Sequence, residues 1–107
     1  MRKIFILALF FSSSCFANDI TKTWMKLEGD YVIAIQQQDY KKALRYALEL
    51  SKIDPKDTQV LLYIVFASVK SQTELPNWVM EKPWSSASTQ DIFNKELAIQ
   101  LLNGRTK

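Results

Sequence analysis

Histidine is absent from this 107-residue chain, and cysteine occurs once, at Cys15. Without histidine and with a single thiol, the usual zinc, copper and haem ligand sets cannot be built. The Ser-His-Asp and Cys-His nucleophile systems are excluded for the same reason. Glycine occurs only at Gly29 and Gly104, so the chain has no glycine-rich phosphate loop. These absences predict a protein that is not an enzyme and that carries no metal or cofactor.

The start of the chain, residues 1–17, follows the three-part pattern of a secretory signal peptide. Residues 2–3 are basic, residues 4–11 form an unbroken apolar run, and the small residues Cys15 and Ala17 precede Asn18. The apolar run is shorter than the roughly 20 residues that span a bilayer. We therefore expect cleavage between Ala17 and Asn18, export to the periplasm, and no integral membrane span in the mature protein.

Cys15 leaves a second form of processing open. Bacterial lipoproteins are cut just before a cysteine that then receives lipid, and their usual motif has Leu and two small residues before that cysteine. Here residues 12–14 are all serine, so the Leu is missing from its place. A lipid anchor through Cys15 is therefore the minor alternative to the soluble exported form.

The mature part, residues 18–107, is long enough for one small domain. It contains no thiol, so packing alone must stabilise it. Cleavage removes two of the 14 basic residues and none of the 11 acidic ones, which leaves a net charge of +1. No clustered basic face of the kind that nucleic-acid binding requires remains. We expect no nucleic-acid partner.

Helical periodicity dominates the mature chain. A first amphipathic helix carries its apolar stripe on Ile20, Trp24, Leu27, Tyr31 and Ala34. A second helix is predicted over residues 39–52, with Asp39 as its N-cap. A last helix is predicted to start at Ser88 with a pattern similar to a capping box and to end at Gly104 as its C-cap. Its predicted apolar stripe is Phe93, Leu97, Ala98, Leu101 and Leu102.

Residues 60–67 are eight consecutive apolar residues. A helix with this pattern is buried on all sides, whereas Val and Ile also favour a buried strand. A helix-start signal precedes the run, with Asp54 as the cap, Pro55 at the first helical position and Asp57 in the first turn. The pattern therefore favours a third helix that continues to Val69, with the strand as the alternative.

Residues 71–87 interrupt the helical pattern with Pro76 and Pro83. This linker nevertheless carries Trp78 and Trp84, which makes it too apolar to float freely. We expect it to fold back as a lid over the third helix. The two tryptophans are either part of that core or anchors for a partner, since Trp is enriched among binding hot spots. Tyr46 is the other candidate binding residue, because it falls away from the apolar stripe of its own helix.

Residues 38–55 resemble the second helix of a tetratricopeptide repeat. Tyr40 lies three residues before Ala43, and Pro55 follows Ala43 by 12 residues, as in that family. The repeat period of about 34 residues places the first helix of the pair at residues 24–37 and the start of a second repeat at Thr58. The pattern fails over residues 72–85, where the prolines lie, and the last helix is expected to replace the missing one.

Together these patterns predict an all-α fold, a small bundle of about four helices that contains a repeat-like antiparallel helix pair. The favoured function is a small exported protein-interaction module, without catalytic activity, that binds another protein or peptide of the cell envelope. The alternative is a carboxylate-dependent hydrolase that acts on an exported glycan or peptide. Its closest carboxylate pair, Asp54 and Asp57, already has a capping role. An exposed apolar groove would favour the binding module, and a polar cleft with two facing acids would favour the hydrolase.

Overall fold

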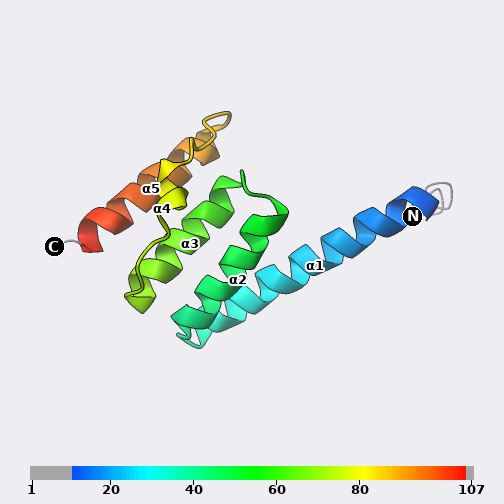
Figure 1. Ribbon diagram of the computed structural model, residues 1–107, viewed down its shortest axis with the longest axis horizontal. Coiled ribbons are helices and arrows are strands. Elements are labelled where there is room, and N and C mark those ends of the chain that lie inside the picture. Colours follow the sequence, from blue (N-terminus) through cyan, green and yellow to red (C-terminus); the bar gives the residue numbers. More distant parts are fainter. Residues whose placement is uncertain (1–10, 106–107) are drawn as a thin grey trace.

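Five helices make up the fold (Figure 1). The computed structural model describes the backbone of residues 11–105 and the side chains of residues 19–105. The predicted signal segment, residues 1–17, lies outside these described side chains. The helices are α1 (Phe11–Gln36), α2 (Tyr40–Ile53), α3 (Thr58–Ser71), α4 (Asn77–Glu81) and α5 (Thr89–Arg105). Residues 11–105 contain no strand, which confirms the all-α bundle and the helix over residues 60–67.

Helices α1 and α2 form an antiparallel pair joined by a tight turn (Figure 1). Gln38 adopts a positive φ of 60° in this turn. The side chain of Asp39 accepts a hydrogen bond from the backbone N–H of Lys42, as predicted for the N-cap of α2. Ala34, Ala43 and Ala47 are fully buried. These small side chains let the neighbouring helices approach closely, and the burial of Ala43 confirms the expected helix contact.

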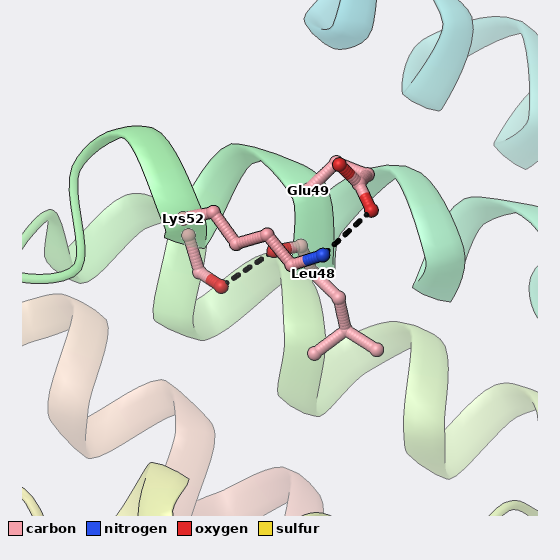
Figure 2. Close-up of polar contacts among 4 residues, drawn as sticks. Leu48, Glu49 and Lys52 are labelled. Atoms are coloured by element: carbon pink, nitrogen blue, oxygen red, sulfur yellow. Dashed lines mark hydrogen bonds and ion pairs between the residues drawn. The ribbon is translucent and has the colours of Figure 1, made fainter.

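The solvent-facing side of α2 is polar. Figure 2 shows Lys52, whose Nζ lies 3.1 Å from Oε2 of Glu49 one turn earlier. Ser51, in the same turn, is buried instead, and its hydroxyl donates a hydrogen bond to the carbonyl oxygen of Leu48 at 2.7 Å. An exposed ion pair such as Lys52–Glu49 stabilises a helix by only about 0.3–0.5 kcal/mol. The apolar face of α2, rather than its charges, therefore holds it in the bundle.

The predicted start of the third helix needs a correction. Asp57, not Asp54, is the N-cap of α3, and its carboxylate accepts a hydrogen bond from the backbone N–H of Gln59 at 2.9 Å. Asp54 is instead the C-cap of α2, and its carboxylate accepts from the backbone N–H of Lys56 at 3.3 Å. Pro55 consequently lies in the turn between the helices. The chain needs these residues to reverse direction before α3 begins.

Helix α3 forms the centre of the hydrophobic core. Of its apolar run, Val60, Leu61, Ile64 and Val65 are at most 1% exposed. The remaining apolar side chains of the run are buried or half-buried. Helix α3 packs against α2 on one side and α5 on the other. A helix enclosed in this way accommodates eight consecutive apolar residues, as the sequence predicts.

The linker between α3 and α5 packs against the core through two buried side chains. Val79 on the short helix α4 is fully buried, and Trp84 is 7% exposed. The indole N–H of Trp84 donates a hydrogen bond to the carbonyl oxygen of Val79 at 3.0 Å. At the same end, Nζ of Lys82 donates to the carbonyl oxygen of Pro55 at 3.2 Å. These contacts agree with the expected lid.

Helix α5 runs parallel to α3 (Figure 1). At their starts, Nδ2 of Asn94 donates to Oγ1 of Thr58 at 3.0 Å. At their ends, a guanidinium nitrogen of Arg105 donates to the carbonyl oxygen of Thr73 at 2.8 Å. The second helix of a repeat would run antiparallel to α3, so α5 does not replace that helix as expected. The linker has already carried the chain back along α3 before α5 begins.

The two ends of α5 differ in how well the sequence predicts them. The hydroxyl of Ser88 accepts a hydrogen bond from the backbone N–H of Asp91 at 3.1 Å, which confirms the predicted capping start. Gly104 does not act as a C-cap, because α5 continues to Arg105 and neither glycine has a positive φ. Arg105 holds this end instead. Phe93, predicted in the buried stripe, is 56% exposed.

No helix among the described residues combines the length and apolar character needed to cross a membrane.

Candidate functional site

An apolar groove lies between α1, α3 and α5. Its hollow has a volume of about 250 Å³. Helix α1 contributes two of the lining side chains, α3 three and α5 two, and all seven are aliphatic or aromatic: Tyr31, Ile35, Leu62, Tyr63, Phe66, Leu97 and Leu101. These residues are called the groove below. Apolar hollows with a few polar groups at the edge are the usual form of a binding site.

Two stacked tyrosine rings join α1 to α3 in the groove. The ring centroids of Tyr31 and Tyr63 are 4.3 Å apart, and the ring planes differ by 18°. The hydroxyl of Tyr31 donates a hydrogen bond to the carbonyl oxygen of Tyr63 at 3.3 Å. Burial raises the pKa of Tyr31 well above its usual range. Both rings therefore form a fixed, uncharged part of the groove.

Polar groups occur at both ends of the groove. The hydroxyl of Tyr63 accepts a hydrogen bond from Nε2 of Gln59 at 3.3 Å. Burial, and then the nearby carboxylate of Glu28, raise the pKa of Tyr63. One turn further along α3 from Phe66, Nζ of Lys70 lies 5.8 Å from the centroid of the Phe66 ring. The groove thus has a carboxylate near one end and an ammonium group near the other.

Phe93 extends the apolar surface of α5 beyond the groove. It lies four residues before Leu97 and eight before Leu101, and residues at these spacings share one face of a helix. The core of α5 is built elsewhere, on Asn94 and Ala98, which are at most 3% exposed. The sequence contains both stripes. Hydrophobicity alone cannot tell which of them faces the core, because the polar Asn94 belongs to the buried one.

The three candidate binding residues from the sequence do not line the groove. Trp84 is buried in the core. Trp78 lies on α4 and is 38% exposed, with Nζ of Lys82 5.1 Å from its ring centroid. Tyr46 is half-buried against the core, and Cζ of Arg45 lies 5.6 Å from its ring. Trp78 is the most accessible of the three and stays a separate candidate for contact with a partner.

The carboxylate pair of the hydrolase alternative lies in the turn between α2 and α3, at the end of α2 that is away from the turn joining it to α1. Asp54 and Asp57 line an open hollow of about 480 Å³ together with Trp24 and Ile53. Each carboxylate accepts a backbone hydrogen bond in the turn between α2 and α3. Among the side chains of residues 19–105, no group of three or more acidic residues could hold a metal ion. The geometry of this pair is that of two turn caps.

The predicted cleavage site between Ala17 and Asn18 falls on the backbone of α1, before the first described side chain. In comparisons with known proteins, no family model, no curated protein and no solved structure matches this chain.

Proposed function

We propose that this protein is an exported protein-interaction module that binds an apolar segment of another envelope protein in the groove. The observation that carries the proposal is the groove itself, whose seven lining side chains are aliphatic or aromatic and come from three helices. The binding of an amphipathic peptide helix in an apolar groove is a recurrent mode of peptide recognition. Five of the seven lining side chains belong to the core or pack against it, so little of their side-chain entropy is lost when a partner binds.

The order of the helices supports a repeat-like origin for the groove. Helices α1, α3 and α5 run in the same direction (Figure 1), and the antiparallel α2 and the linker with α4 connect them. One repeat period of about 34 residues leads from Trp24 to Thr58 at the start of α3, and a second leads to Ile92 in the first turns of α5. Repeat proteins of this class bind partners on the surface that their successive helices share.

The length of α1 supports the proposed export. Helix α1 has 26 residues and α2 has 14, so α1 is longer by about 18 Å at 1.5 Å per residue. Its N-terminal part extends past the other helices (Figure 1). The end of α2 at Ile53 lies beside Asp19, Ile20 and Thr23 of α1, which line one hollow with it. Cleavage before Asn18 would therefore leave the contacts between α1 and α2 in place.

A peptide selection tests the proposed groove. A random peptide library is selected on the immobilised protein, and the affinity of a selected peptide is then measured by calorimetry for groove variants. Leu97→Lys in the groove and Phe93→Lys on the apolar surface that continues it along α5 should each weaken binding about tenfold or more, since about 1.4 kcal/mol of lost contact gives that change. Trp78→Ala is the matched control outside the groove and should leave the affinity unchanged. The proposal is wrong if Trp78→Ala abolishes binding while Leu97→Lys and Phe93→Lys bind normally.

A further inference from the structure

Helix α1 carries a second apolar stripe on the side that faces away from the core. Met25 is 64% exposed, Val32 is 47% exposed and Ile33 is 50% exposed. Gly29 lies between them in the sequence, and a Cβ atom built on it would have nothing within 4 Å. Residues 25, 29 and 32 follow the spacing of a single helix face. This outer stripe is distinct from the face of α1 that buries Tyr31 and Ala34.

Helix α5 carries a comparable outer stripe. Ile92 is 50% exposed and Ile99 is 41% exposed. They are seven residues apart, like Met25 and Val32 on α1, and therefore lie two turns apart on one face. The buried face of α5, with Asn94 and Ala98, points toward α3 instead.

The two stripes lie at opposite ends of the helix layer. Helix α3 is packed between α2 and α5, and α1 packs on α2, so α1 and α5 are the outermost helices (Figure 1). Repeat-like arrays normally end in helices with a polar outer face, since an apolar end face favours association. Here both end helices expose apolar side chains. Each end thus resembles a surface from which a neighbouring helix is missing.

The charges beside the stripes select one relative orientation of the two helices. On α1, Lys22 and Lys26 flank one edge of the stripe and Glu28 flanks the other. Lys26 also pairs with Asp30 on its own helix at 2.8 Å. On α5, Glu96 and Lys95 flank the two edges. These positions follow from the helical rotation of about 100° per residue.

When α5 packs antiparallel on α1, with Ile99 beside Met25 and Ile92 beside Val32, opposite charges meet along both edges. Glu96 then lies beside Lys26, and Lys95 lies beside Glu28. A parallel arrangement would bring Lys95 to the lysine edge and Glu96 to Glu28. Like charges in that position disfavour pairing, as they do between helices of a coiled coil.

We propose that copies of this chain associate head to tail, with the outer stripe of α5 on one copy packed antiparallel against the outer stripe of α1 on the next. The partner is a second copy because the chain itself supplies both complementary surfaces. In a dimer each copy still has one unused stripe, one on α1 and the other on α5, so the interface is heterologous and does not close. The interface contains a single helix pair, which is smaller than the standard-sized interface of a stable complex. The association is therefore weak and depends on concentration.

Sedimentation velocity on the protein in the form that cells accumulate tests this inference. Between about 10 µM and 1 mM, the range of weak complexes, the average mass should rise through dimer to larger species. Val32→Lys blocks the α1 stripe and Ile99→Lys blocks the α5 stripe, and both positions are exposed, so folding is preserved. Gln100→Lys adds the same charge beside Ile99 but a quarter turn round the helix, and it should still associate.

The mixture of the two blocked variants gives the decisive result. Each variant alone should stay monomeric, whereas the mixture should form a one-to-one dimer and nothing larger, because it contains one intact α5 stripe and one intact α1 stripe. A mixture that stays monomeric overturns the inference. So does a parent protein that is monomeric at every concentration, or a single variant that associates as the parent does. Peptide binding in the groove does not depend on any of these outcomes.

Discussion

Replacing Trp84 by alanine should remove a large part of the stability of this domain. Trp84 is 7% exposed, belongs to the hydrophobic core and is the donor to the carbonyl oxygen of Val79. Truncating a buried Trp side chain costs about 3–5 kcal/mol, since the protein closes the resulting cavity only in part. A small domain has a total unfolding free energy of about 5–15 kcal/mol. Trp84→Ala should therefore shift the unfolding midpoint strongly.

Two further variants separate the contributions of the Trp84 ring and its N–H group. Trp84→Phe keeps most of the ring but leaves the carbonyl of Val79 without this donor, so it should cost about 1–3 kcal/mol. Trp78→Ala removes a partly exposed ring and its contact with Lys82, and a contact of that kind contributes about 0.5–1 kcal/mol. Urea unfolding followed by circular dichroism at a single temperature compares all three with the parent. If Trp84→Ala costs no more than Trp78→Ala, Trp84 does not hold the linker on the core.

Three other outcomes follow from the structure. Ala43→Trp should cost about 1–3 kcal/mol or more in urea unfolding, because Ala43 is fully buried where helices meet; an unchanged midpoint would contradict that packing. The pKa of Asp91 is lowered by hydrogen bonds from the hydroxyls of Thr58 and Ser85. The stability that these hydrogen bonds add to the folded state is present above the unfolded pKa of about 3.9 and is lost as pH falls through the lower folded value. Asp91→Asn should thus be less stable than the parent at pH 7, and the difference should close below about pH 4; a difference that persists in acid would refute this assignment. Mass spectrometry of the exported protein should give Asn18 as its first residue, whereas a lipid-modified species would support the alternative processing.

Local signals in the sequence predict α2, α3 and α5 well, since a capping residue and an apolar period specify each of them, whereas the short helix α4 has no side-chain cap and lies in the predicted linker. The Asp39 cap of α2 and the Ser88 cap of α5 both form the predicted hydrogen bonds. The start of α3 is less determined, because Asp54 and Asp57 are both good caps and only the space needed by the turn decides between them. Gly104 fails as a stop signal, since Arg105 fixes that end through Thr73, which is distant in the chain.

The groove could be predicted only in part. Tyr31, Leu97 and Leu101 stand out in the sequence as members of apolar stripes, a pattern that predicts side chains facing the core. Their place in an open groove depends on the direction of α5, which long-range contacts such as that between Thr58 and Asn94 determine. No local pattern encodes such a contact. The buried Asn94 further hides the core face of α5, because a polar residue normally marks the exposed side.

The most direct test of the proposed function is to map the contact surface of a selected peptide by nuclear magnetic resonance. The backbone amide signals of the ¹⁵N-labelled protein are recorded while the peptide is added. The largest shift changes should occur in the groove, around Tyr31, Tyr63 and Leu97. Changes confined to the surroundings of Trp78, with the groove signals unmoved, would contradict the proposed function.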